Sequence, residues 1–293
     1  MQAAALLKLP GFILRLGKPG PYIRSVAGVC RTLYRNRFLL IDMAMRDIKD
    51  QYLGKGLGVL WAVIQPVFLI AVYIFAFVYV FKIRLSTAGE IPIPAGDMTL
   101  YIVSGIVPFF AVQNALMRSS GILIQNSNLV KQVVFPVEVL PAKVLSSTLL
   151  TQIICTGLLI IYILIRFHSL SPLIILLPVV LVLQYAILLG CSYLLSIITP
   201  FFKDLSELIS MVCTVLMYAT PIFYSVDMLP EVIRPYMNLN PMAHLLYCYR
   251  DILCYNEITH PWSWVVLVCL SAFLLGLGTR LFGKTKMLLG NVL

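Results

Sequence analysis

Six long apolar runs constrain this sequence more than any other feature. They cover residues 57–81, 98–117, 141–165, 172–199, 205–224 and 262–282. A transmembrane helix needs about 20 predominantly apolar residues, and each run reaches that length. Only 12% of the residues are charged, against about 25% in a soluble domain. The sequence therefore predicts an all-α integral membrane protein with six transmembrane helices in residues 57–293.

The basic residues predict the orientation. Residues 1–56 contain no apolar segment followed by a small-residue cleavage site, so we expect no cleavable signal peptide and a cytoplasmic amino-terminal segment. With an even number of spans, most lysines and arginines then face the cytoplasm, as the positive-inside rule requires. The exceptions are Lys82, Arg84, Arg166, Arg234 and Arg250. This topology and attraction to anionic membrane lipid account for the net charge of +10, so we expect no nucleic-acid partner.

An amphipathic helix is predicted just before the first span. Its apolar stripe consists of Tyr34, Phe38, Ile41, Met45, Ile48 and Tyr52. A neighbouring charged stripe consists of Arg31, Arg35, Asp42, Arg46 and Lys49. Such a helix lies in the membrane interface. The periodicity leaves open whether it only anchors the chain or also contacts a cytoplasmic partner.

Two short helices are predicted between the fifth and sixth runs, in residues 225–261. The first has an apolar stripe of Leu229, Val232, Ile233 and Tyr236, and the second has one of Leu245, Tyr249, Ile252 and Leu253. Asn240 supplies a cap and Pro241 a first-turn proline for the second helix. Because both helices are too short to span, we expect a re-entrant pair on the outer side, covered by protein or lining a cavity.

The cytoplasmic segment 119–140 contains SNLVKQVVFPVEVLP, from residue 127 to 141. Asn126 or Ser127 can cap a short helix there, and Pro136 and Pro141 are expected to end it before the next span. The segment would expose an apolar patch of Leu129, Val130, Val133, Val134 and Phe135. Such a patch favours docking to a partner over a plain linker.

A search for catalytic motifs finds little. Residues 278–285, GTRLFGKT, match the P-loop spelling. They end a predicted membrane helix, however, so we interpret Arg280, Lys284 and Lys286 as anchors on the inner side and expect no ATP hydrolysis by this chain.

The remaining polar candidates are sparse as well. The three histidines lack metal-site spacing, and the seven cysteines include no CxxC, so we expect no metal and no catalytic residue. Asp204 with Glu207 is interpreted as a solvated face. Arg250 with Asp251 is interpreted as a structural ion pair rather than a catalytic one. The near absence of ionisable residues in the spans argues against an ion-coupled carrier.

The spans are rich in aromatic residues instead. Interfacial positions and packing explain many of them. Trp61, Tyr73 and Tyr218 could instead line a path for sugars, because flat rings stack on the apolar faces of sugar rings. Phe77 and Phe223 belong to the same candidate channel set.

The order of four stretches resembles a known family. RDIKDQYLGKGLGVLWAVIQP (46–66), SNLVKQVVFPVEVLP (127–141), TPIFYSVDMLP (220–230) and LNPMAHLLYCYRDIL (239–253) resemble the membrane subunit of bacterial ABC-2 type polysaccharide exporters. The resemblance is to O-antigen export permeases, with capsule and teichoic-acid exporters as relatives. It implies a multi-pass protein of the bacterial inner membrane with both termini in the cytoplasm.

The resemblance also implies partners. Two copies of this chain and two ATPase subunits, which bind ATP and Mg²⁺, would export an undecaprenyl-diphosphate-linked polysaccharide. The amino-terminal helix would then lie beside the ATPase, and the paired outer helices would gate the exit.

The resemblance assigns candidate roles to individual residues. ATPase coupling would use Asn128, Leu129, Lys131, Phe135 and Pro136. The outer gate would use Pro230, Tyr236, Asn240, Pro241, Arg250 and Asp251. Attraction of the lipid diphosphate would use Arg46, Lys49 and Lys55. An ABC exporter of a small lipid or drug and a membrane-embedded transferase are the alternatives.

Overall fold

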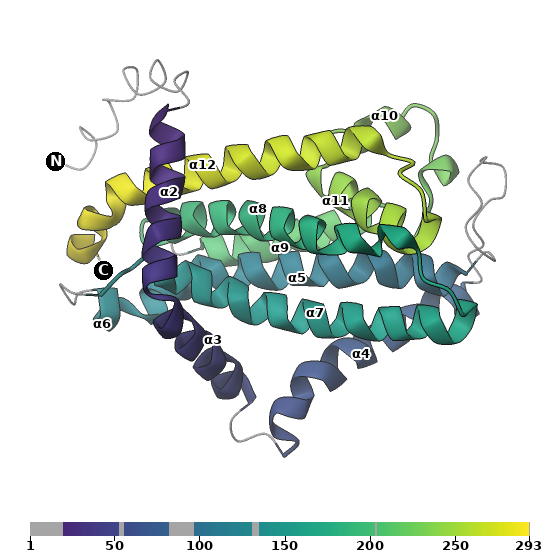
Figure 1. Cartoon of the computed structure of the whole chain (residues 1–293), viewed down its shortest axis with the longest axis horizontal. Coiled ribbons are helices and arrows are strands. Elements are labelled where there is room, and N and C mark those ends of the chain that lie inside the picture. Colours follow the sequence, from purple (N-terminus) through teal and green to yellow (C-terminus); the bar gives the residue numbers. More distant parts are fainter. Residues whose placement is uncertain (1–19, 53–55, 82–96, 131–134, 203, 293) are drawn as a thin grey trace.

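The computed structural model describes residues 20–52, 56–81, 97–130, 135–202 and 204–292. All regular elements in this part of the chain are helices. The long helices are α5 (Met98–Gln125), α7 (Val139–Phe167), α8 (Leu177–Ile198, preceded by the 3₁₀ helix η5, Pro172–Leu176) and α12 (Pro261–Val292). They run side by side, with α5 packed against α7, α8, α9 (Leu205–Ala219) and α11 (Pro241–Arg250) (Figure 1). The core is therefore built around α5.

Among the described residues, five helical segments are long and apolar enough to cross a membrane. They are Val63–Val80, Met98–Gln125, Val139–Phe167, Pro172–Ile198 and Pro261–Lys286. The predicted fifth run, 205–224, is helical only in α9, which has 15 residues. It ends at Ala219 because Pro221 disfavours a helical conformation at Thr220, which is extended. The structure thus supports a multi-span protein, and the sixth span stays a prediction.

The first span packs loosely on the rest of the chain. It comprises η2 (Gly58–Leu60), α4 (Trp61–Ile74) and the π-helical η3 (Phe75–Val80). None of the residues in its apolar window is buried, and α4 leans away from the other long helices (Figure 1). Phe68, Phe75 and Tyr79 expose most of their side chains. This surface is therefore free to meet lipid or another chain.

The amino-terminal region forms two helices where one amphipathic helix was predicted. α2 (Gly20–Arg35) packs on α12, and α3 (Arg37–Tyr52) packs on α7. Within the predicted stripe, Ile48 is buried, whereas Tyr34, Phe38, Ile41 and Met45 are exposed. The side of α3 that faces the protein carries Ala44, Asp47 and Ile48. Most of the apolar stripe therefore points away from the chain.

The segment between α9 and α12 has one well-formed helix. It contains η6 (Val226–Met228), α10 (Arg234–Met237), α11 and the π-helical η7 (Asp251–Tyr255). The Asn240 side chain accepts from the Met242 amide at 2.9 Å, and Pro241 opens α11, which confirms the predicted cap. The first predicted helix is reduced to the single turn of α10, and its Val232 and Tyr236 are exposed. Proline at positions 230 and 235 limits its length.

The P-loop spelling lies inside the continuous helix α12. Its first glycine, Gly278, packs against Gly190 of α8, where an added Cβ would lie 2.3 Å from the Gly190 carbonyl oxygen. The motif thus belongs to a close helix contact and has no loop in which to hold phosphate. Because Gly278 has no side chain, the backbones of α8 and α12 can pack closely at this position.

The short helix α6 (Ser127–Val130) follows α5 directly. The Asn126 carbonyl accepts from the Leu129 and Val130 amides at 2.9 and 3.1 Å, so Asn126 precedes its first turn. α7 begins at Val139, two residues before Pro141, so Pro141 lies in its first turn instead of ending the segment. This position is tolerated because the first-turn amides have no intrahelical acceptor.

Candidate functional site

Four of the five predicted channel aromatics meet in one cluster. Phe77 stacks on Phe223 with ring centroids 4.1 Å apart and ring planes 7° from parallel. Tyr73 lies 5.3 Å from Phe223 and 6.0 Å from Phe110, and Tyr218 lies 6.4 Å from Phe223. We call these five residues the aromatic cluster. It joins the first span to α5 and to the end of α9, and the predicted Trp61 has no ring contact with it in the described part of the chain.

A crevice of about 500 Å³ lies between α4, α5 and α7, next to the cluster. Phe110 belongs to both. We call it the amide crevice, because its polar lining includes Gln51, Gln65, Gln113, Asn114 and Gln152, with Thr148 and Thr151. Arg118 closes its end toward α3. It combines hydrogen-bonding groups with apolar wall residues, mostly from segments that are long and apolar enough to cross a membrane.

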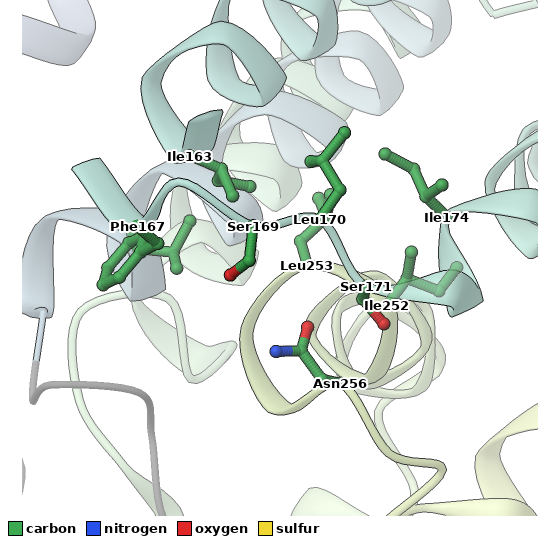
Figure 2. A pocket seen from close by; sticks show the side chains of 10 residues that line it. Ile163, Phe167, Ser169, Leu170, Ser171, Ile174, Ile252, Leu253 and Asn256 are labelled. Carbon is green, nitrogen blue, oxygen red and sulfur yellow. The ribbon is translucent and has the colours of Figure 1, made fainter. Parts of the chain in front are cut away.

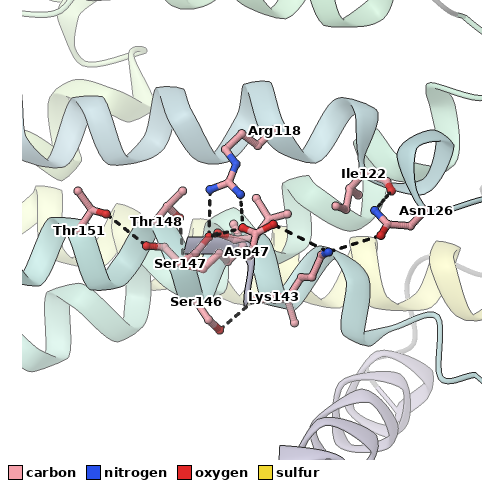
Figure 3. A network of polar contacts seen from close by, with 12 residues as sticks. Asp47, Arg118, Ile122, Asn126, Lys143, Ser146, Ser147, Thr148 and Thr151 are labelled. Carbon is pink, nitrogen blue, oxygen red and sulfur yellow. Dashed lines mark hydrogen bonds and ion pairs between the residues drawn. The ribbon is translucent and has the colours of Figure 1, made fainter. Parts of the chain in front are cut away.

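A polar junction ties α3 to α5 and α7 (Figure 3). Asp47 of α3 forms an ion pair with Arg118 of α5, accepts from the Ser147 hydroxyl at 3.0 Å and lies 3.9 Å from the Lys143 ammonium. Lys143 also contacts the Asn126 amide oxygen at 3.5 Å. The same side chains therefore connect the amino-terminal helix, the start of α7 and the residue that precedes α6.

Arg250 is completely buried in α11. Its guanidinium lies 3.5 Å from the centroid of the Tyr101 ring and donates to the Ile222 carbonyl at 3.2 Å. Gly105 of α5 leaves it room, since a Cβ there would lie 3.1 Å from the guanidinium. The Nε and Nη1 groups have no hydrogen-bond partner among the described residues. Arg250 thus joins α11 to α5 and to the extended stretch after α9.

Asp251 points to a different set of partners. Its carboxylate accepts from the Thr259 hydroxyl at 2.6 Å and from the Trp264 indole at 2.9 Å, and it lies 2.9 Å from the His260 Nδ1. Burial raises the pKa of Asp251, but these hydrogen bonds outweigh it and leave the pKa below its usual value. The predicted Arg250–Asp251 ion pair is wrong, because consecutive residues of one helix point in different directions.

α11 reaches a polar network inside the bundle. The Tyr249 hydroxyl donates to Gln184 Oε1 at 2.6 Å and accepts from Gln152 Nε2 at 2.9 Å. Gln184 is seven residues into α8, which places this contact about 10 Å below the start of that helix. All three residues are buried. The network therefore connects α11 with the wall of the amide crevice through Gln152.

A smaller cavity of about 140 Å³ lies where the α7–η5 connection meets η7. Figure 2 shows Phe167 and Ile163 from α7 on one side and Leu253 and Asn256 on the other. Its lining is mainly apolar, with Ser169 and Ser171 at the connection. This cavity lies between η7 and the Phe167 end of α7.

The predicted coupling residues are partly packed. Leu129 and Phe135 are half-buried against the core, and Asn128 is exposed. Pro136 is half-buried beside them. Lys131 and Lys55 lie outside the described residues, as do Val133 and Val134. The apolar patch is therefore smaller than predicted in the part of the segment that the structure describes.

Several other predicted site residues are exposed on the surface of the chain. Arg46 and Lys49 are exposed on α3, and Pro230 and Tyr236 are exposed before and within α10. Sequence reasoning missed the polar residues that connect the helices or line the amide crevice. These are Asp47, Arg118, Lys143, Gln152, Gln184, Gln113 and Asn114. The available signal was the occurrence of Gln and Asn inside apolar runs, which in membrane helices face protein or a cavity.

Comparison with known proteins gives consistent matches. The sequence model of one family, described as ABC-2 type transporter, matches residues 39–254, more than half of the chain. The O-antigen export system permease protein RfbA of Klebsiella pneumoniae is 26% identical over 258 residues, 87% of this chain and 95% of the relative. The protein of the same name from Myxococcus xanthus is 26% identical with the same coverage. The polysialic acid transport protein KpsM of Escherichia coli is 21% identical over 81% of this chain and 90% of its own length.

Proposed function

Because the chain belongs to the ABC-2 type transporter family, we propose that it is the permease subunit of an exporter of O-antigen or a related polysaccharide. The relatives are named as permeases and transport proteins for such polymers. The observation that carries the proposal is the aromatic cluster beside the amide crevice. Rings that stack on sugar faces and amides that bond hydroxyls are the two groups that a glycan path needs.

In this proposal the cargo is a lipid-linked glycan and the energy comes from a separate ATPase. α3 and the segment around α6 provide the cytoplasmic surface for that ATPase. The exposed stripe of Tyr34, Phe38, Ile41 and Met45 and the exposed Asn128 are available for contact. The polar junction at Asp47 supports the proposal, because it holds α3 close to the helix that leads into α6.

The proposed topology has six spans, with α9 and the residues after it as the fifth. The exit is gated by α11, which enters the outer side and returns. Two observations support this position: the hydrogen bonds of Tyr249 inside the bundle, and the burial of Arg250 and Asp251. Both termini then lie in the cytoplasm of a bacterial cell, and the chain lies in its inner membrane.

The first experiment tests the partner. The tagged chain is extracted from its native membrane in mild detergent, and a copurifying ATPase is identified by mass spectrometry. Asn128→Trp places a large ring on the exposed position of α6 and should release the ATPase. Leu129 and Phe135 are poor choices because both also pack on the core. Ile165→Trp, at an exposed site near the other end of α7, is the control and should retain it.

The second experiment tests the cargo. Cells that lack this chain should lose long surface glycan and keep their drug resistance, and the wild-type gene should restore the glycan. A preparation without any ATPase, together with unchanged surface glycan, would contradict the proposal. Loss of a capsular polymer with intact O-antigen would point to capsule export, which the similarity to KpsM keeps as the second candidate.

A further inference from the structure

Three side chains in the amide crevice lack partners. In the described part of the chain, Gln65, Gln113 and Asn114 line the crevice and form no hydrogen bond with other residues. Gln65 comes from α4, and the other two come from α5. Asn114 is eleven residues from the end of α5, about 17 Å along its axis, which is inside the hydrocarbon depth of a membrane of about 30 Å.

Lipid tails are a poor neighbour for these amides. Transfer of an amide from water to an apolar medium without a hydrogen bond costs several kcal/mol. Amides in membrane helices are for this reason found facing other helices or polar cavities. Three unpartnered amides around one crevice therefore indicate a polar occupant.

The lining also indicates which occupant. Arg118 is already paired with Asp47, and no other charged side chain lines the crevice among the described residues, so an anion would find no free cation there. Amides both donate and accept hydrogen bonds, as sugar hydroxyls do. The Phe110 ring at the cluster end offers a flat apolar surface. The volume of about 500 Å³ lies within the usual range for small-molecule sites.

We propose that the amide crevice binds polyhydroxylated sugar units of the transported glycan on their way to the aromatic cluster. This inference rests on the proposed function and assigns a location to its substrate. A sugar bound there lies beside Gln152, which bonds Tyr249 of α11, and beside Arg118, which bonds Asp47 of α3. A sugar in the crevice would therefore contact Gln152 and Arg118, whose hydrogen-bond partners lie on α11 and on α3.

Photo-crosslinking tests this directly in cells that make the glycan. Leu69→benzoylphenylalanine puts the probe on the crevice wall from α4 without altering an amide. Leu150→benzoylphenylalanine puts it on the outer apolar groove of α7 and α8. The two leucines are similarly exposed, at 40% and 43%, so they form a matched pair. We expect a periodate-sensitive, high-mass adduct at position 69 only.

Other adducts would overturn the inference. A sharp, periodate-resistant band at twice the mass of the chain would mean that a second copy fills the crevice. Identical lipid adducts at positions 69 and 150 would mean that lipid fills it. If either adduct is found while surface glycan still depends on this chain, the sugar site is refuted and the proposed function is not. Surface glycan that does not depend on the chain refutes the proposed function itself.

Amide variants give an independent readout in the same cells. Gln113→Leu with Asn114→Leu should lower the sugar adduct at position 69 about tenfold, the effect expected when one or two hydrogen bonds are lost. Gln113→Asn with Asn114→Gln keeps the chemistry and should retain most of the adduct. Gln125→Leu, on the same helix but outside the crevice, should leave it unchanged. Equal adducts in all three variants would exclude a role for the amides.

Discussion

Arg250 illustrates how one buried cation is held without a carboxylate. Its charge is stabilised by the Tyr101 ring and by backbone carbonyls, including that of Ile222, while two of its nitrogens, Nε and Nη1, have no partner in the described part of the chain. A planar guanidinium can stack its face on a ring while its N–H groups donate hydrogen bonds in the guanidinium plane. The ammonium group of lysine has no such flat face. Lysine is therefore a poor substitute at this position.

Arg250→Lys should lower the free energy of unfolding by about 2 kcal/mol, because stacking is lost and the charge stays buried. Thermal unfolding in detergent measures this. The control is Arg234→Lys, since the half-exposed Arg234 also donates to carbonyls, those of Leu229 and Asp227, but its charge reaches solvent. The control should change stability by less than about 0.5 kcal/mol. Equal losses in both variants would contradict this account of Arg250.

At the scale of elements, the backbones of α8 and α12 approach each other closely at two glycines. A Cβ on Gly190 would lie 2.3 Å from the Leu274 carbonyl carbon and oxygen, and one on Gly278 would meet the Gly190 carbonyl at the same distance. Neither obstacle is a flexible side chain. The two helices would have to separate to admit a methyl group, as at other small-residue contacts between membrane helices.

Gly278→Ala should therefore destabilise the protein by about 1–3 kcal/mol, the usual cost of overpacking. The expected change appears as a lower midpoint of thermal unfolding. Gly157→Ala on α7 is the matched control, because an added Cβ there meets nothing within 4 Å. It should leave stability unchanged or raise it slightly, as alanine favours helix over glycine. An unchanged midpoint of thermal unfolding in Gly278→Ala would show that α8 and α12 can move apart without loss of stability.

The polar junction attaches α3 to α5 and α7. Asp47→Asn removes the negative charge that Arg118 and Lys143 share, and both cations are largely covered. We expect α3 to detach locally, so that its backbone amides exchange with deuterium about tenfold faster while α5 and α8 stay protected. Asp42→Asn, on the exposed side of the same helix, should match the wild type. Unchanged exchange in α3 would mean that the apolar contacts of Ala44 and Ile48 suffice.

At the scale of the whole molecule, the first span and α9 leave broad apolar faces uncovered. Phe68 and Phe75 on one side, and Met211 and Val215 on the other, expose more than half of their side chains. The aromatic cluster lies between these two elements. In the proposed function the cluster lines a path for a polymer, and a second copy of this chain would supply the opposite wall.

We therefore expect two copies of this chain together with two ATPase subunits in the working exporter. Native mass spectrometry of the complex released from membrane nanodiscs gives the stoichiometry directly. A Val215→Arg variant should yield single chains, because a charge on an apolar interface prevents association. The matched variant Ile161→Arg, exposed on α7, should keep the pair. A complex with one copy in both variants would place the path within one chain.

Several features of the site followed from local sequence. Asn240 and Pro241 predicted the start of α11 correctly, because capping depends on neighbouring residues only. Tyr73, Phe77, Tyr218 and Phe223 were grouped by their chemistry, and the structure brings them together. Trp61 makes no ring contact with them, because it begins α4, about 18 Å along the helix axis from Tyr73, and its role in a channel stays a prediction.

The polar partners could not be predicted in the same way. Asp47 and Arg118 are 71 positions apart, and Gln152 and Tyr249 are 97 apart. Nothing in a local pattern distinguishes Asp47, which is bonded in the junction, from Asp42, which is exposed on the same helix. Arg250 and Asp251 were paired because they are adjacent in sequence, although the helix turns their side chains apart.

The sequence by itself determined that this chain is helical and crosses a membrane. The bilayer thickness sets the length of a span, and the apolar interior of the bilayer requires apolar side chains and internal backbone hydrogen bonds, so a span can be recognised from a single stretch of sequence. It also determined where α11 begins, through the Asn240 cap and the first-turn Pro241. Only the tertiary structure decided which helix faces meet, since amides, charges and glycines at distant positions must fit one another at once. The amide crevice, the junction at Asp47 and the Gly190–Gly278 contact are all products of that packing.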